Sequence, residues 1–228
     1  MTQPVVPGSG SLTQDERVLA ARVQGLVEIA PDTPMIKLLA PGELERYLRR
    51  EVSQGEWGRR PPFDFRTVGG IVARAQDTTN LRTPVEFMRA FRVDYPGSPF
   101  RPDQPVVHVM EFLAVQPGQF VIPLGAPASL DPSAGLRPNT PAVRDAAYAM
   151  IDAAATAGLD PNTYRMEIAP WPYTGTGVTA DPELGVPERW KRPSTVPSGA
   201  TIFQYDPSAR KLPVAIYRGA ALGWEQLR

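Results

Sequence analysis

The chain has 228 residues, with 24 basic and 24 acidic side chains, so its formal net charge at neutral pH is zero. That balance argues against a nucleic-acid partner, and the absence of a long uninterrupted apolar run argues against a membrane span. With no cysteine and a single histidine, the chain has no means of forming disulfides, thiolate or histidine-rich metal sites, or a cysteine nucleophile, and we expect no metal.

The N-terminal part of the chain is predicted to be a leader followed by helices. Residues 1–12 are polar and rich in proline and glycine, which is typical of a disordered leader without the apolar run of a signal peptide. Thr13 and Glu16 have the spacing of a helix capping box, and a second helix is expected over 41–52. We therefore predict an N-terminal helical segment over 13–62.

The next part of the chain predicts strands separated by a helix. Residues 65–75 have the composition of a strand, and the motif Thr83-Pro-Val-Glu86 is a second capping box that begins a helix. The apolar stretches 106–115 and 120–124 are separated by the turn pair Pro117-Gly118, which predicts a β-hairpin.

The last part of the chain begins with a helix, expected over 140–156 and stopped by a glycine. A strand is expected over 164–169, residues 170–199 are predicted to be mostly irregular, and a closing hairpin is expected within 201–218. Short strands interrupted by helices favour a single α+β domain, with a mixed, mainly antiparallel sheet and several short helices, over residues 63–228.

Two arginines in the first predicted strand are candidates for binding a phosphate group. Arg66 and Arg74 are eight residues apart, and an even separation places both on one face of a strand. Gly69 and Gly70 lie between them and allow a ligand to approach the backbone N–H groups. Two guanidinium groups beside exposed amides suit a pyrophosphate. The alternative is a solvated strand face whose arginines pair with acids.

A second candidate site combines an aromatic, threonine-rich and glycine-rich loop with a glutamate. Trp171, Tyr173, Thr174 and Thr176 offer rings for stacking and hydroxyl groups for a sugar or phosphate. Glu188 follows the loop, and a carboxylate there is suited to stabilising positive charge at a ribose carbon or to orienting water. The alternatives are a rigid packing loop and a surface glutamate.

His108 is the only histidine, so any serine hydrolase triad would depend on it. Strand alternation places His108 on the same face as Met110 and Phe112 and places Glu111 on the opposite face. This pattern favours a packing role for His108, with Glu111 paired to an arginine of a neighbouring strand.

Several short motifs together resemble the C-terminal toxin domains of bacterial polymorphic toxins, in particular the NAD-glycohydrolase and ADP-ribosyltransferase-like groups. The resemblance covers residues 63–218. It rests on Val68-Gly-Gly-Ile-Val-Ala-Arg-Ala-Gln-Asp77, Leu81-Arg-Thr-Pro84, Val107-His-Val-Met-Glu-Phe112 and Pro172-Tyr-Thr-Gly-Thr-Gly177.

The resemblance implies that NAD is a substrate and that water or a protein side chain is the acceptor. The residues expected to bind NAD are Arg66, Gly69, Gly70, Arg74, Trp171, Tyr173, Thr174 and Thr176. Glu188 or Asp77 would assist departure of nicotinamide. An immunity protein is an expected partner, and the expected location is the bacterial cytoplasm or outside the cell by a route that needs no signal peptide.

Two other functions remain open at this stage. The first is a non-catalytic structural or partner-binding module of a phage, a secretion system or a secreted effector, which the 27 prolines and the zero net charge favour. The second is a hydrolase that uses His108.

Overall fold

The computed structural model describes residues 12–55, 62–93, 98–126, 140–167, 175–179, 181 and 183–227. The expected leader therefore lies almost wholly outside the described residues. The helices are α1 (Gln14–Gly25), α2 (Glu43–Leu48), α3 (Pro84–Ala90) and α4 (Pro141–Thr156), with 3₁₀ turns η1 (Ala75–Thr78), η2 (Pro117–Gln119) and η4 (Pro161–Thr163). The strands are β1 (Pro34–Leu39), β2 (Val52–Ser53), β3 (Phe63–Asp64), β4 (Thr67–Arg74), β5 (Val107–Leu113), β6 (Phe120–Gly125), β7 (Tyr164–Glu167), β8 (Glu188–Thr195), β9 (Thr201–Tyr205), β10 (Lys211–Tyr217) and β11 (Trp224–Gln226).

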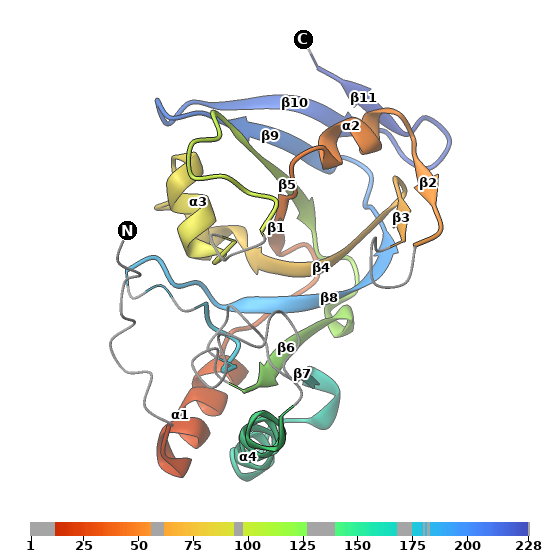
Figure 1. Ribbon diagram of the computed structural model, residues 1–228. Helices are drawn as coiled ribbons and strands as arrows, with labels where there is room; N and C mark the ends of the chain where they lie inside the picture. Colours follow the sequence, from red (N-terminus) through yellow and green to blue (C-terminus); the bar gives the residue numbers. More distant parts are fainter. Residues whose placement is uncertain are drawn as a thin grey trace.

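One large curved sheet organises the molecule (Figure 1). Among the described residues its nine strands follow the order β11-β10-β9-β5-β1-β4-β8-β6-β7, and β2 and β3 form a separate pair. All neighbours in the large sheet are antiparallel except β6 and β7, which are parallel. The expected single α+β domain with a mixed, mainly antiparallel sheet is therefore confirmed.

The N-terminal residues 13–62, expected to be helical, supply a central strand of this sheet. β1 pairs with β4 on one side and with β5 on the other, with Met35 opposite both Arg74 and Phe112. The segment is thus tied into the domain by two strand ladders. In the run Met-Ile-Lys-Leu-Leu the four apolar side chains are buried, two on each face, and Lys37 is partly buried.

The helix starts predicted from capping boxes are confirmed. The Thr13 hydroxyl accepts a hydrogen bond from the Glu16 N–H, and the Glu16 carboxylate accepts one from the Thr13 N–H at 2.7 Å. Thr83 and Glu86 repeat the arrangement at the start of α3, with a proline in the first turn. These contacts satisfy N–H groups that a helix start leaves unpaired.

The predicted hairpin of residues 106–115 and 120–124 is wrong. β5 lies between β1 and β9, whereas β6 pairs with β8 and β7, so the 3₁₀ turn η2 leads the chain away from β5 toward the far side of the sheet. The closing hairpin is confirmed by the pairing of β9 with β10. The prediction of an irregular 170–199 missed β8, whose Lys-Arg-Pro-Ser run lacks the apolar alternation of a strand.

Apolar side chains are buried on both faces of the sheet. Val72, Met110 and Phe112 pack on one face, with Tyr47 and Trp224 closing that cluster. The other face is covered by α3. Beyond β8, α1 and α4 lie against each other and cover one face of β6 and β7 (Figure 1).

Candidate active site

A buried carboxylate stands at the start of β8. The Glu188 side chain is 0% exposed, and neither of its oxygens has a hydrogen-bond partner among the described residues. Burial raises the pKa of Glu188 well above its ordinary value, the Arg189 guanidinium lowers it, and the Glu167 charge raises it further. Because unpaired buried carboxylates cost stability, they mark candidate functional sites.

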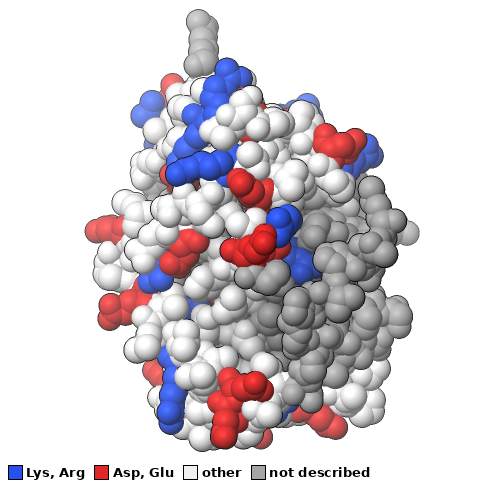
Figure 2. Space-filling model, turned by 90° about the vertical axis from the view of Figure 1, so that its left-hand side faces the viewer, with Lys and Arg blue, Asp and Glu red and all other residues white. Residues whose placement is uncertain are grey.

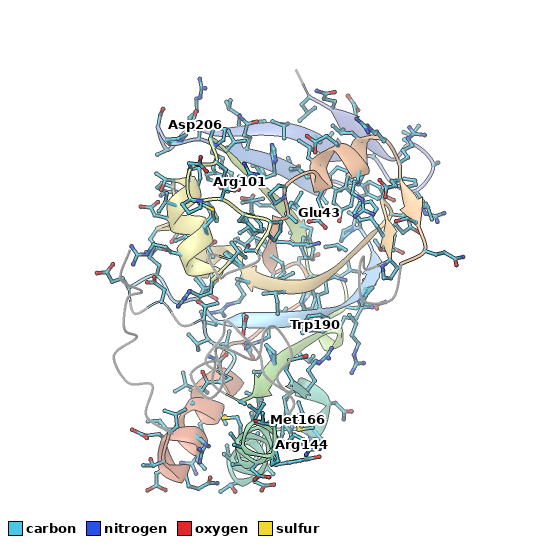
Figure 3. All side chains as sticks on the ribbon, in the orientation of Figure 1. Glu43, Arg101, Arg144, Met166, Trp190 and Asp206 are labelled. Atoms are coloured by element: carbon cyan, nitrogen blue, oxygen red, sulfur yellow. The ribbon has the colours of Figure 1, made fainter. Side chains whose placement is uncertain are left out.

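Glu188 shares a face of the sheet with three other polar or aromatic side chains from β7 and β8. Strand alternation places the side chains of Glu188 and Trp190 on the same face of β8. The guanidinium carbon of Arg165, on β7, lies 4.6 Å from the centre of the Trp190 ring. Glu167 follows two positions after Arg165, so its side chain is on that face too. Met166, between them, points the other way and packs under α4 (Figure 3).

Glu167 is the second carboxylate of the site. Its Oε2 atom lies 2.9 Å from Nη2 of Arg165, but the alignment is not that of a hydrogen bond, and this buried oxygen has no hydrogen-bond partner. The face thus holds two carboxylates, one guanidinium and one indole ring. We call Arg165, Glu167, Glu188 and Trp190 the carboxylate cluster.

Two glycines allow the segment before β8 to pack tightly against β6 and next to Glu188. Gly175 and Gly177 have φ of +81° and +79°, in the left-handed region that glycine favours. A Cβ atom on Gly175 would overlap the carbonyl of Gly125, and one on Gly177 would lie 2.6 Å from the Ile122 side chain. The Gly-Thr-Gly sequence is therefore required by packing.

Thr176 and Thr179 hold this segment on either side of Gly177. Thr176 is 8% exposed and forms an isolated bridge with Leu124 of β6. The Thr179 hydroxyl accepts a hydrogen bond from the Val186 N–H at 2.9 Å. The structure thus brings Thr176 and Glu188, both predicted site residues, into one region, and packing accounts for the buried position of the threonine.

An ion pair from α3 anchors the loop that leads to Glu188. Arg89 donates to the Asp181 carboxylate at 3.0 Å and to Glu183 at 3.1 Å. Asp181 also accepts from the N–H groups of Glu183 and Leu184, which closes a tight turn. These contacts fix the chain shortly before Glu188 enters β8.

Arg66 and Arg74 do not form a joint phosphate site. Arg66 is exposed and donates to the Asp64 carboxylate at 2.7 Å. Arg74 is paired with Asp77 at 2.7 Å and donates to the Glu28 carbonyl. Eight residues of strand separate the two by roughly 26 Å, several times the span of a pyrophosphate. Arg66 and Arg74 are each paired with an acidic side chain, as the alternative interpretation of the sequence had it. Asp77, predicted as a catalytic residue, is the partner of Arg74.

The glycine pair between these arginines serves the sheet. The Cβ of any larger residue at Gly69 would lie 2.9 Å from the backbone of Pro193 on β8, and Gly70 has φ of +93°. The register of β4 and β8 shifts at this point, between the pairs Val68–Ser194 and Gly70–Lys191. The expected irregularity or close backbone approach is therefore present, and its partner is β8.

Trp171, Tyr173 and Thr174 lie outside the described residues. His108 is partly buried, and strand alternation puts it on the face of β5 that carries Met110; its expected packing role stays a prediction. Burial lowers the pKa of His108, and a hydrogen bond with Gln204 opposes that shift. Glu111 pairs with a lysine, Lys211, where an arginine was expected.

Three residues of the carboxylate cluster were not predicted as site residues: Arg165, Glu167 and Trp190. Their signal was present in the alternation of the predicted strand 164–169, which puts Arg165 and Glu167 on one face. Their proximity to β8 depends on β6 lying between β7 and β8, and no local pattern contains that information.

Comparison with protein-family models, with curated proteins and with solved structures gave no match. Among the described residues, no group of three or more His, Cys, Asp or Glu side chains is placed to hold a metal ion. The helices described in the structure include none long and apolar enough to cross a membrane. On the face seen in Figure 2, acidic and basic side chains are interspersed over the described part of the surface.

Proposed function

We propose that the chain is an NAD-consuming toxin-type domain, an NAD glycohydrolase or ADP-ribosyltransferase, in which Glu188 acts on the bond between nicotinamide and ribose. The observation that carries the proposal is the Glu188 carboxylate, fully buried and without a hydrogen-bond partner. A buried carboxylate is costly by itself and becomes favourable when a ligand supplies a positive charge beside it.

The nicotinamide ring of NAD⁺ supplies that charge. When the bond from the ring nitrogen to the ribose C1′ breaks, the bonding electrons move to the ring and the positive charge passes to the ribose. A carboxylate beside C1′ stabilises both the bound cation and the oxocarbenium-like transition state. Water or a protein side chain then attacks C1′, and we assign to Glu167 the role of accepting the proton of that nucleophile.

Arg165 and Trp190 suit the rest of the nucleotide. The guanidinium of Arg165 can exchange its contact with Glu167 for the pyrophosphate, to which it offers a planar set of donors. The indole ring of Trp190 has the planar guanidinium of Arg165 over one face. These residues take over the role that the sequence assigned to Arg66 and Arg74.

The proposal is tested by incubating the purified protein with NAD and measuring released nicotinamide by chromatography. We expect turnover by the wild-type chain and a loss of at least a hundredfold in the turnover of Glu188→Gln, with NAD binding weakened but still measurable. Glu225→Gln is the matched control, because Glu225 makes a surface ion pair with Arg218 away from the cluster. If the wild-type protein leaves NAD intact, the proposal fails and the partner-binding module is preferred.

A further inference from the structure

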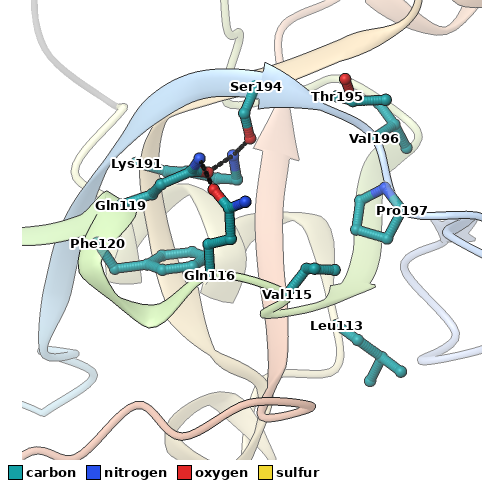
Figure 4. Close-up of a pocket in the computed structure, with 10 residues that line it drawn as sticks. All are labelled: Leu113, Val115, Gln116, Gln119, Phe120, Lys191, Ser194, Thr195, Val196 and Pro197. Atoms are coloured by element: carbon teal, nitrogen blue, oxygen red, sulfur yellow. Dashed lines mark hydrogen bonds between the residues drawn. The ribbon is translucent and has the colours of Figure 1, made fainter.

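A second polar group on β8 faces a separate cavity. The cavity has a volume of about 410 Å³ and lies between β8 and the connection from β5 to β6 (Figure 4). Its apolar wall is formed by Leu113, Val115, Val196 and Pro197. Its polar wall is formed by Gln116, Gln119, Lys191 and Ser194.

Lys191 is buried in that wall, with a residue exposure of 3%. Among the described residues, the hydrogen bonds of its ammonium group go to carbonyl, amide and hydroxyl oxygens and not to a carboxylate. Its Nζ atom lies 2.5 Å from the Ser194 hydroxyl oxygen, 3.1 Å from the carbonyl oxygen of Val68 and 3.1 Å from that of Arg192. The Gln119 amide oxygen is more distant, at 3.4 Å.

A bulge in β8 brings Lys191 and Ser194 together. Residues three apart on a regular strand point to opposite faces. In the pairing with β4, Lys191 is opposite Gly70 and Ser194 is opposite Val68. Three residues along β8 therefore match two along β4. The extra residue of β8 returns the Ser194 side chain to the face that carries Lys191. Pro193 lies in the bulge, where it needs no N–H for the ladder, and Gly69 leaves room for it.

The neutral amine fits this site as well as the ammonium does. A neutral lysine has two N–H groups and one lone pair, which match the two carbonyl oxygens and a hydroxyl proton of Ser194. Burial lowers the pKa of Lys191 to about 8. The lowered pKa increases the share of the neutral amine near neutral pH.

We propose that Ser194 is a nucleophile activated by Lys191, acting on esters with a short apolar acyl group that fits the wall formed by Leu113, Val115, Val196 and Pro197. Serine activated by an adjacent base is a recurring arrangement for acyl transfer. The Gln116 amide nitrogen points away from Gln119 toward the cavity, where it can donate to the oxyanion (Figure 4).

The reaction balances with groups present at the site. The Ser194 Oγ attacks the ester carbonyl carbon, and its proton passes to Lys191 Nζ. The bond from that carbon to the alkoxy oxygen then breaks, and the ammonium returns the proton to the leaving alcohol. Water attacks the acyl-serine, gives one proton to Lys191, and releases the acid as Ser194 recovers its proton.

The experiment uses a fluorophosphonate probe, which forms a stable bond to activated serines as fluoride leaves. We expect one label per chain, located at Ser194 by peptide mass spectrometry and lost in Ser194→Ala. Ser208→Ala is the matched control, since Ser208 lies in the exposed turn between β9 and β10. The labelling rate of the wild-type chain should rise with pH and reach half its maximum near pH 8, where Lys191 loses its proton.

A second variant separates activation from accessibility. Lys191→Met keeps the length of the side chain but removes the base, so the labelling rate at Ser194 should fall at least a hundredfold. The wild-type chain should also hydrolyse p-nitrophenyl acetate, and Ser194→Ala should not. Absence of label at Ser194, or a labelling rate independent of pH between 6 and 9, would overturn the proposal even if Lys191→Met does not fold.

Discussion

The backbone N–H of Glu188 donates a hydrogen bond of 2.8 Å to the carbonyl oxygen of Gly177. This bond fixes the first residue of β8 to the Gly-Thr-Gly segment, which itself packs on β6. The position of the buried carboxylate therefore depends on a glycine eleven residues earlier in the chain. Substitutions at Gly177 and at Glu188 test this dependence.

The first prediction concerns Gly177. Gly177→Ala should lower the free energy of unfolding by about 1–2 kcal/mol for the left-handed backbone, with a further loss from overlap with Ile122. Gly199→Ala is the matched control, because Gly199 has φ of +87° and a Cβ atom added there would have no neighbour within 4 Å. Urea unfolding of both variants gives the comparison. An equal loss of stability in the two would contradict the packing role of Gly177.

The second prediction concerns the pH dependence of stability. The unfolded chain releases the Glu188 proton near its ordinary pKa of 4.5, whereas the raised pKa in the folded state retains it. Because the folded state holds this proton more tightly, the Glu188 carboxyl lowers the free energy of unfolding as the pH rises. The decrease is about 1.4 kcal/mol for each pH unit above 4.5, until the pKa of the folded state is reached.

Glu188→Gln removes that dependence. The difference in free energy of unfolding between Glu188→Gln and the wild-type chain should move in favour of the variant as the pH rises. Urea denaturation between pH 4 and pH 8 measures it. Parallel curves for the two proteins would show that Glu188 titrates normally in the folded state.

The third prediction concerns Arg165. Arg165→Ala should weaken NAD binding by about one to two decades, because a charge-assisted contact with phosphate is worth about 1.5–3 kcal/mol. Arg144→Ala is the matched control on α4, which covers the opposite face of β7 (Figure 3). Binding is measured by calorimetry in the Glu188→Gln background, in which turnover is expected to be at least a hundredfold slower. An equal effect of both substitutions would mean that Arg165 acts only through net charge.

The fourth prediction concerns Arg74. Arg74→Ala should lower the free energy of unfolding by about 1–3 kcal/mol, since it leaves the partly buried Asp77 without its partner. NAD affinity should stay within about twofold of the wild-type value, because Arg74 lies on the opposite face of the sheet from the carboxylate cluster. A tenfold loss of affinity in a fully folded variant would restore the arginine to the binding site.

Local signals predicted the helix starts, because Thr13 with Glu16 and Thr83 with Glu86 form their contacts within a single turn. The position of β6 could not be predicted from the same kind of signal. The turn pair Pro117-Gly118 fits a hairpin locally, but the pairing of β6 with β8 joins residues about seventy positions apart. Long-range pairing of this kind is decided by burial of the whole sheet.

The candidate site, too, could be predicted only in part from local sequence. Glu188 was predicted from its place after a Thr/Gly loop, which the hydrogen bond to Gly177 now explains. Arg66 and Arg74 were predicted from an even spacing that placed them on one face. The spacing carries no information about the acids Asp64 and Asp77, which occupy both guanidinium groups.

We predict that binding of the cationic nicotinamide ring ionises Glu188. It is tested most directly by calorimetric titration with carba-NAD, in which a methylene replaces the ring oxygen of the nicotinamide ribose and cleavage is suppressed. Titrations at about pH 6 in buffers of different ionisation enthalpy give the number of protons released. We predict a release of up to one proton by the wild-type chain and none by Glu188→Gln, and none with the reduced analogue, whose ring is neutral. Equal proton release by the wild-type chain and Glu188→Gln would contradict the claim.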